Sequence, residues 1–279
     1  MDRYAVVGHP VGHSQSPFIH ARFAEQTGQA MSYERLFAPL DGFARTVREF
    51  AAGGARGCNV TVPFKAEACA LSAHRTDRAA LSGTANTLRF DADGWHADNT
   101  DGVGLVRDIT RHAGFVIGGA RVLLVGAGGA AAGALGPLLG ECPAALTVVN
   151  RTPARAEELV RRHAALAQTL GVALAAATLA DCGSGFDIVV NATSASLNEA
   201  ALPLAPMVFR DGGLALDMMY GGAACGFLGW AAAHGAAPRD GLGMLVEQAA
   251  EAFWFWRGVR PDAPPVLRAL RERLAQPAA

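Results

Sequence analysis

Three short segments place small polar side chains in an otherwise apolar chain: Ser14–Pro17 (SQSP), Asn59–Lys65 (NVTVPFK) and Asp98–Gly102 (DNTDG). Because side chains alternate between the two faces of a strand, Asn59 and Thr61 are expected on one side of an extended segment that runs up to Lys65. Hydroxyl and amide groups gathered in this way could hydrogen-bond a ligand that carries several hydroxyl groups.

A glycine-rich turn at residues 126–131 (GAGGAA) follows the apolar run Val122–Val125 and precedes a long stretch rich in alanine and leucine. The pattern G-x-G-x-x-A between a strand and a helix is typical of a dinucleotide site, in which the helix N-terminus faces the pyrophosphate. An ordinary strand–helix turn is the alternative. The predicted cofactor contacts in this turn are Gly126, Ala127, Gly128, Gly129 and Ala130.

The end of the next predicted strand discriminates between cofactors. NAD-binding units usually place an acidic residue there, to bind the ribose hydroxyls. This chain has Asn150, Arg151 and Thr152, with Arg155 one helical turn later. Arginines could bind a 2′-phosphate that an acid would repel, so the sequence predicts NADP, unless both merely decorate an exposed helix start.

The elements that position these residues follow from the spacing of apolar side chains. Strands are predicted at Tyr4–Gly8, Ser32–Ala38, Asn59–Pro63, Val122–Val125, Thr147–Asn150, Asp187–Asn191 and Leu214–Asp217, with a hairpin over Asn86–Phe90 and Trp95–Asp98. Helices are predicted at Ser16–Thr27, from an Asp41 N-cap to Ala52, near Lys65, from Gly102 to His112, after the glycine turn, from Pro153 to about Ala165, and from Met244 onward with a break at Gly258–Pro265. Strands that alternate with helices indicate an α/β fold with a parallel sheet.

Composition excludes several classes of protein. Half of the residues are hydrophobic (51%) and 18% are charged, which is unlike a disordered chain, and 24 basic against 25 acidic residues leave no nucleic-acid footprint. The five cysteines are scattered and the eight histidines lack metal-binding spacing, so neither a disulfide framework nor a metal site is expected. The charge-free stretch Val122–Gly140 contains glycines and Pro137, which favour a buried strand and helix over a membrane span. A cytoplasmic protein is therefore expected.

In its motifs the chain resembles the shikimate dehydrogenase family from end to end. The matching stretches are Ser14–Pro17, Asn59–Lys65, Asn86–Leu88, Asp98–Gly102, Gly126–Ala130, Asn150–Thr152, Asn191–Ser194 and Asp240–Leu245. The resemblance implies the NADPH-dependent, reversible reduction of 3-dehydroshikimate to shikimate, in the pathway to chorismate and the aromatic amino acids. It also implies two domains separated by a cleft: a substrate-binding catalytic domain at 1–101, completed by 243–279, and a Rossmann-type, doubly wound NADP-binding domain at 102–242.

The resemblance also implies roles for single residues. Lys65 and Asp101 match the catalytic pair: the Lys65 ammonium would stabilise and protonate the developing oxyanion, and Asp101 would orient Lys65. Matches to substrate-binding residues are Ser14, Ser16, Thr61, Asn86, Tyr220 and Gln248, with Asn59 in a supporting role. Ser14 and Ser16 would bind the substrate carboxylate. Matches to cofactor-binding residues are Thr193, Met218, Gly241, Met244 and Asp77.

Two departures and two rival functions stay open. Ala131 and Ala132 stand where the family often has an arginine, and Ala195–Asn198 replaces a segment that commonly contains glycine. One rival is a quinate/shikimate dehydrogenase that uses NAD or NADP. The other is a non-catalytic nucleotide-binding sensor, against which the retention of Lys65 and Asp101 argues. The protein is expected to be a monomer or a homodimer.

Overall fold

The computed structural model describes residues 1–193 and 204–276. These divide into two compact units: unit 1 combines Met1–Gly104 with the chain from Leu245 onward, and unit 2 is Leu105–Met244. The last helical segment therefore belongs to the same unit as the first hundred residues. The chain passes between the units inside two helices, α5 (Asp101–Arg107) and α9 (Leu242–Arg257).

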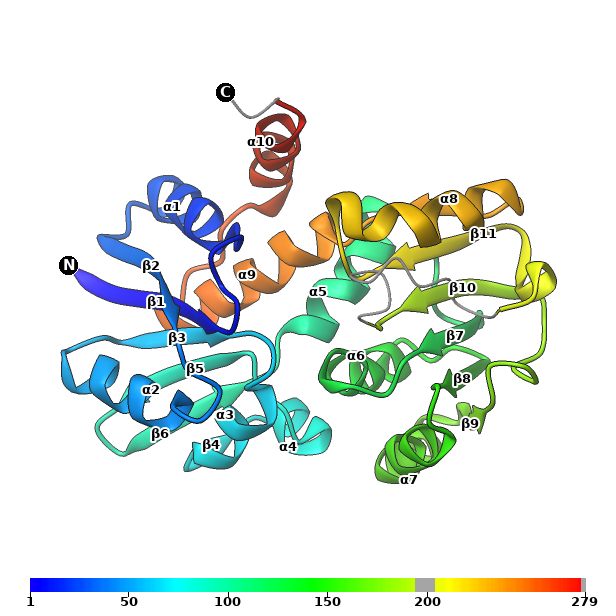
Figure 1. Cartoon of the computed structure of the whole chain (residues 1–279), viewed down its shortest axis with the longest axis horizontal. Helices are drawn as coiled ribbons and strands as arrows, with labels where there is room; N and C mark the ends of the chain where they lie inside the picture. The colour runs from blue at the N-terminus through cyan, green and yellow to red at the C-terminus, as the bar shows by residue number, and fades with distance from the viewer. Residues whose placement is uncertain (194–203, 277–279) are drawn as a thin grey trace. The chain divides into compact units, whose positions relative to one another are not determined.

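Unit 1 contains a six-stranded mixed sheet in the order β2-β1-β3-β5-β6-β4 (Figure 1). The strands are β1 (Asp2–Gly8), β2 (Met31–Phe37), β3 (Gly57–Val60), β4 (His74–Arg75), β5 (Thr87–Asp91) and β6 (Gly94–Asp98). β1 is parallel to β2 and β3, whereas β5 is antiparallel to both β3 and β6. The register aligns Asn59 with Thr87 and Thr87 with Asp98, so these three residues lie in one row across the sheet.

Helices cover both faces of this sheet. The helices of unit 1 are α1 (Ser16–Thr27), α2 (Phe43–Ala52), α3 (Lys65–Leu71), α4 (Asp77–Ser82), most of α9, and α10 (Ala263–Ala275). On one face, Phe43 and Val47 of α2 pack with Ala5 and Val7 of β1. On the other face, Tyr4 packs against Trp256 of α9.

Unit 2 contains six parallel strands in the order β12-β11-β10-β7-β8-β9. They are β7 (Arg121–Val125), β8 (Ala145–Val149), β9 (Ala173–Ala177), β10 (Phe186–Asn191), β11 (Phe209–Asp217) and β12 (Ala237–Arg239). Counted from β7, this is the 3-2-1-4-5-6 order of the doubly wound dinucleotide-binding fold, whose ligand lies at the carboxyl ends of the strands where the order reverses. The predicted α/β fold class, with its Rossmann-type half, is confirmed.

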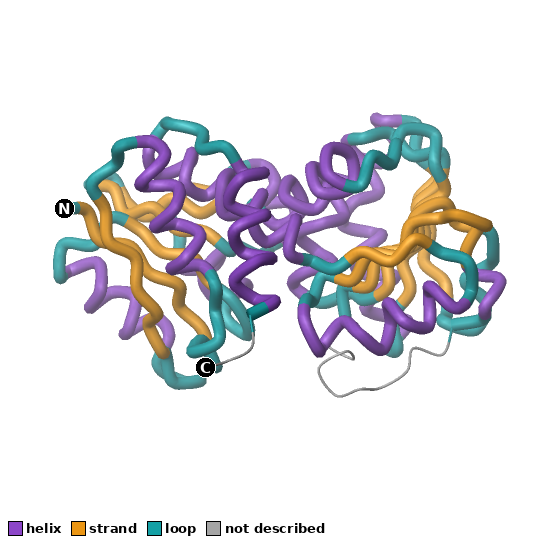
Figure 2. Tube along the Cα trace, turned by 90° about the horizontal axis from the view of Figure 1, so that it is seen from above, coloured by secondary structure: helices purple, strands orange, loops and turns teal. Residues whose placement is uncertain are grey.

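Helices lie on both sides of the unit 2 strands (Figure 2). α5, α6 (Gly129–Gly140) and α7 (Pro153–Leu170) pack on one face, and α8 (Cys225–Ala233) packs on the other. Among the described residues, no helix is both long enough and apolar enough to cross a membrane.

Several predicted elements need correction. The helix α2 starts at Phe43 with Gly42 as its N-cap, so Asp41 does not cap it. The strand predicted over Asn59–Pro63 ends at Val60, which leaves Thr61 outside the alternation expected to pair it with Asn59. The helix predicted to end near Ala165 continues to Leu170, where Gly171 closes it in a left-handed conformation.

Candidate active site

The strand ends of unit 1 bring together an amine and a carboxylate. Lys65 is the first residue of α3, which follows β3, and Asp101 is the first residue of α5, which follows β6. Lys65 Nζ donates a hydrogen bond to Asp101 Oδ2 over 2.6 Å, and the two side chains are only 16% and 7% exposed. A largely buried ammonium held by one carboxylate can deliver a proton to a substrate oxygen or remove one from it.

The sequence offers a signal for Lys65 that the motif analysis did not use. Lys65 is the only lysine of the chain, and the other 23 basic side chains are arginines. An arginine stays protonated at any physiological pH, whereas a lysine can lose its proton. Lys65 therefore supplies the one side-chain amine of the sequence, and reversible proton transfer would need an amine at this position.

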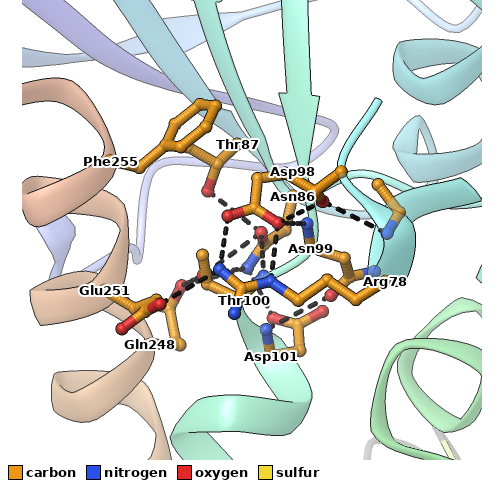
Figure 3. A network of polar contacts seen from close by, with 12 residues as sticks. Arg78, Asn86, Thr87, Asp98, Asn99, Thr100, Asp101, Gln248, Glu251 and Phe255 are labelled. Carbon is orange, nitrogen blue, oxygen red and sulfur yellow. Dashed lines mark hydrogen bonds and ion pairs between the residues drawn. The ribbon is translucent and has the colours of Figure 1, made fainter. Parts of the chain in front are cut away.

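Asn86 orients Asp101 from the other side. Asn86 Nδ2 lies 2.8 Å from Asp101 Oδ1, 2.9 Å from Thr100 Oγ1 and 3.1 Å from Gln248 Oε1, and its two N–H groups are shared among these three acceptors (Figure 3). Asn86 and Gln248 are both buried. The predicted substrate residues Asn86 and Gln248 thus meet the predicted catalytic Asp101 in one network, although Gln248 lies far away in sequence on α9.

A buried ion pair, which the sequence did not indicate, anchors the segment before Asp101. Arg78 of α4 binds both carboxylate oxygens of Asp98, which is 1% exposed, and Thr76 Oγ1 donates to the same carboxylate over 2.7 Å (Figure 3). Arg78 also pairs with Glu251 of α9 at 3.1 Å. Burial alone would lower the pKa of Arg78, but its hydrogen bond to Asp98 and the nearby charges raise it. The network ties α4, β6 and α9 together next to Asp101.

Ser14 and Ser16 lie at the start of α1. The Ser14 hydroxyl donates to Ser16 Oγ over 3.1 Å and accepts from the Ser16 backbone N–H over 3.2 Å. Arg35, which no matched motif includes, donates from Nη2 and Nε to the Ser14 carbonyl over 2.6 and 3.0 Å. Two hydroxyls beside a helix N-terminus and a guanidinium form a suitable environment for a carboxylate.

The remaining predicted substrate residues differ in surroundings. The Asn59 side chain bonds to protein groups at both ends, since its oxygen accepts from Tyr33 and its nitrogen donates to Thr87 and to the Asn86 carbonyl. Asn59 is therefore part of the support for the site. Thr61 is partly exposed. Tyr220 follows β11 in unit 2, where burial raises the pKa of its hydroxyl.

The glycine turn of unit 2 has the shape that a pyrophosphate requires. Gly126 has a φ of 116°, and a Cβ there would come within 3.2 Å of the Ala192 carbonyl and of Thr193. Gly128 is the N-cap of α6, has no side chain to satisfy the helix N–H groups, and has open space where a Cβ would lie. Uncapped N–H groups next to open space can bind an anion.

The predicted 2′-phosphate residues follow β8. Arg151 and Arg155 are exposed at the start of α7, and no carboxylate within the described ranges forms an ion pair with either guanidinium. Asn150 Nδ2 donates to the Thr152 carbonyl over 3.0 Å and so fixes the turn between them. Two arginines without a carboxylate partner in these ranges, at a strand end that has no acidic residue, are suited to the 2′-phosphate of NADP.

The other predicted cofactor residues differ in their surroundings. Thr193 Oγ1 donates to Asn191 Oδ1 over 2.8 Å at the end of β10, and Gly241 is held so close to the Met218 carbonyl that a Cβ at residue 241 would clash with it. Met244, in contrast, is 7% exposed and packs in the core of unit 2. Asp77 is an exposed residue of α4 in unit 1. The segment Ala195–Asn198 lies outside the described residues.

One group of side chains in the described part of the chain has ligand atoms spaced for a metal ion. His74, Asp93 and His96 lie within 4.8 Å of one another on β4 and the β5–β6 hairpin. Asp93 is exposed, and its hydrogen bond with His96 lowers its pKa below the usual value. We assign no metal to these three groups.

Comparison with known proteins places this geometry in a family. Residues 6–88 match the shikimate dehydrogenase substrate binding domain, 109–200 the shikimate/quinate 5-dehydrogenase family, and 241–271 the shikimate 5′-dehydrogenase C-terminal domain. A protein of Methylibium petroleiphilum named shikimate dehydrogenase (NADP(+)) is 68% identical over 276 residues, which cover 97% of this chain and 94% of that protein. This chain belongs to the shikimate dehydrogenase family.

Solved structures of the family have the same architecture. Shikimate 5-dehydrogenase from Thermus thermophilus, in complex with NADP(H) and shikimate, has a TM-score of 0.84 at 32% identity, and the alignment covers 98% of this chain and 99% of that one. An Ael1 enzyme from Pseudomonas putida has a TM-score of 0.88 at 43% identity, with coverages of 97% and 98%. The chain therefore shares its fold with both of these solved structures over nearly its whole length.

Proposed function

We propose that this enzyme is an NADP-dependent shikimate dehydrogenase that reversibly reduces 3-dehydroshikimate to shikimate. The observation that carries the proposal is the hydrogen bond between Lys65 and Asp101, formed inside a unit that matches the substrate binding domain of the family. The reaction belongs to the pathway that leads to chorismate and the aromatic amino acids.

Proton transfer is the task we assign to Lys65. As the ring ketone is reduced, negative charge develops on its oxygen; the Lys65 ammonium stabilises this charge and gives a proton to the oxygen. In the direction of oxidation, neutral Lys65 accepts the proton of the shikimate hydroxyl. Bound NADPH supplies the hydride. Asp101, held at Oδ1 by Asn86, keeps the amine oriented and uses its remaining acceptor capacity for a substrate hydroxyl.

Substrate binding is assigned to polar groups at both ends of the site in unit 1. Asn86 and Gln248 lie next to Asp101 and would bind ring hydroxyls. Ser14 and Ser16, close to the Arg35 guanidinium, would bind the substrate carboxylate. Thr61 and Tyr220 are further proposed substrate contacts. A carboxylate at one end and a ketone at the other would fix the ring in one orientation.

Cofactor binding is assigned to unit 2. The N–H groups at the start of α6 would bind the pyrophosphate, and Arg151 and Arg155 would bind the 2′-phosphate. Thr193, Met218 and Gly241 would border the nicotinamide; the buried position of Met244 in the core favours a supporting role for that residue.

Steady-state kinetics with shikimate and quinate, each with NADP and NAD, test the proposal. We expect the highest kcat/KM for shikimate with NADP. Comparable turnover of quinate with NAD would replace this assignment by a quinate/shikimate dehydrogenase. A purified, folded protein that binds NADP but oxidises neither substrate would instead support a nucleotide-binding sensor. The cytoplasmic location and the monomeric or dimeric state remain predictions, to be checked by fractionation and by light scattering.

A further inference from the structure

We propose that Tyr33, Asn59 and Thr87 are positioning residues, which fix the orientation of Asn86 and, through it, that of Asp101. This inference rests on the proposed function, because it assumes that Asp101 orients the proton-transferring amine. None of the three would touch the reacting atoms. Their side chains form a continuous hydrogen-bonded chain that ends at the Lys65–Asp101 pair.

The chain runs through four contacts inside unit 1. The Tyr33 hydroxyl donates to Asn59 Oδ1 over 2.7 Å. Asn59 Nδ2 donates to Thr87 Oγ1 over 3.0 Å, and Thr87 Oγ1 donates to Asn86 Oδ1 over 3.0 Å. Asn86 Nδ2 then donates to Asp101 Oδ1 over 2.8 Å, which leaves Oδ2 to accept from Lys65. All the donors therefore point in one direction, toward the carboxylate.

Backbone groups fix this direction at two points. The Asn86 carbonyl can only accept, and it accepts from Asn59 Nδ2 over 3.1 Å, so Asn59 Oδ1 must face the Tyr33 hydroxyl. The Thr100 N–H can only donate, and it donates to Asn86 Oδ1 over 2.9 Å. A flipped Asn86 amide would place two donors against each other there, and would turn its oxygen toward the Asp101 carboxylate. The network therefore permits one orientation of both amides.

Because these residues are buried, the loss of any one hydrogen bond in the chain should be costly. Thr87 is fully buried, Asn86 is 3% exposed and Asn59 is 6% exposed, so water cannot replace a missing partner at low cost. The Tyr33 ring stacks on the buried ring of His20 with 4.3 Å between centroids. This packing holds the phenol at the far end of the chain, and burial of the hydroxyl raises its pKa well above the usual value, so it remains a donor.

Thr87 offers the sharpest test, because its hydroxyl is both the acceptor from one amide and the donor to the next. Thr87→Val removes the hydroxyl at nearly constant shape, and Thr87→Ser retains it. For Thr87→Val we expect about a tenfold lower kcat for shikimate oxidation, the effect of losing one well-formed hydrogen bond, while KM for NADP stays within about twofold. Thr87→Ser should recover most of the rate. Thr46→Val is the matched control, because the Thr46 hydroxyl donates to the Gly42 carbonyl and takes no part in the hydrogen-bonded chain that runs from Tyr33 to Asp101, and it should retain the wild-type rate.

A readout at Lys65 separates positioning from a loss of folded protein. Since Lys65 is the only lysine, a chain grown with ¹³C,¹⁵N-lysine gives one side-chain spin system whose titration can be followed by NMR. In Thr87→Val, Asn86 Oδ1 loses the Thr87 donor and keeps the Thr100 N–H. The Asn86 amide is then held less firmly, its hydrogen bond to Asp101 is weaker, and more of the carboxylate's negative charge acts on the ammonium. The side-chain NMR signals of Lys65 should shift, and the acidic limb of the kcat–pH profile should move to higher pH. An unchanged profile, with the rate reduced only in proportion to folded protein, would overturn the inference.

A second variant tests whether the chain acts as a unit. Tyr33→Phe removes only the first donor and should lower kcat by about threefold. If both residues act through Asn86, the double variant Tyr33→Phe/Thr87→Val should be no slower than Thr87→Val alone, whereas multiplied losses would contradict a shared route. A wild-type protein that fails to oxidise shikimate would overturn the proposed function, and this inference with it. An active wild type that matches Thr87→Val in rate and NMR signals would overturn this inference alone.

Discussion

Lys65 Nζ lies 2.6 Å from Asp101 Oδ2, at the first residues of two helices that follow β3 and β6 of the same sheet. The register of that sheet produces the meeting, because β5 runs antiparallel between the two strands and aligns the end of β3 with the end of β6. The pair therefore lies where the carboxyl end of β3 meets that of β6, and the pairing of these strands through β5 holds its geometry.

Replacing the amine should abolish proton transfer without abolishing binding. Lys65→Ala is expected to lower kcat by about 10³-fold, within the range for loss of a general acid–base group, and to change KM for shikimate by less than about tenfold. Steady-state kinetics over a range of shikimate concentrations measure both values. Arg48→Ala, on α2, is the control. A Lys65→Ala enzyme with wild-type kcat would remove Lys65 from the mechanism.

Arg151 should discriminate between the two nicotinamide cofactors. Loss of a charge-assisted bond to a 2′-phosphate is expected to raise KM for NADPH by about 10- to 100-fold in Arg151→Ala, with KM for NADH nearly constant. Arg161→Ala, on the same helix and paired with Glu158, should leave both values unchanged. Equal weakening of NADPH and NADH would show that Arg151 does not read the 2′-phosphate.

The ion pair between Arg78 and Asp98 should contribute strongly to the free energy of unfolding. Asp98 is 1% exposed and bound to Arg78, so Asp98→Asn removes the buried carboxylate that binds Arg78 at two points, leaves Glu251 as the remaining counter-charge, and should cost about 3 kcal/mol of unfolding free energy. Denaturant unfolding followed by tryptophan fluorescence measures the change. The pair Arg210–Asp187, whose side chains are 69% and 26% exposed, supplies a more solvated comparison, since Asp187→Asn should cost well under about 1 kcal/mol. Similar losses in both variants would contradict the argument from burial.

His20 should make unit 1 less stable in acid. Burial lowers the pKa of His20 from 6.5 to about 3, so between these values the unfolded chain takes up a proton that the folded chain does not. Stability therefore falls as pH decreases below 6.5, by about 2 kcal/mol at pH 5 from this residue. Unfolding free energies of wild type and His20→Phe, compared at pH 8 and pH 5, isolate the contribution. The exposed His13→Gln serves as control, and a difference that does not vary with pH would refute the prediction.

Removal of metal should leave the reaction unaffected. We assign proton transfer to Lys65, and within residues 1–193 and 204–276 none of His74, Asp93 and His96 forms a hydrogen bond with Lys65 or Asp101. Extended dialysis against EDTA is expected to change kcat and KM by no more than assay error. Loss of activity that returns on addition of a divalent ion would require a metal in the site or in its support.

Strong local patterns made much of the fold predictable. Val122–Val125 and Asp187–Asn191 are apolar strands with clear boundaries, and both were placed correctly. β9 was missed because its sequence, ALAAA, consists largely of alanine, which has low strand propensity. β12 contains Pro238 and is an edge strand, where proline is tolerated. Such edge strands owe their pairing to the neighbouring strand more than to their own composition.

Only part of the candidate site could be predicted from the sequence. Its central residues could be named from motifs, but the ion pair of Arg78 with Asp98 depends on β4 and α4, which are too short to leave a periodic signal. Likewise, His74 and His96 face each other only because β4 pairs with β6. Spacing in the sequence can indicate site residues that lie on the same helix or strand. Residues that become neighbours across different strands can be predicted only when the strand order is known.

A chain with one lysine beside one carboxylate also lends itself to covalent labelling. Amine-directed reagents can modify two groups here, the α-amine and Lys65, and shikimate bound over the latter should shield it. The amount of label that substrate excludes would then equal the number of intact sites in a preparation. The same reagent would serve as an inactivator and as a titrant.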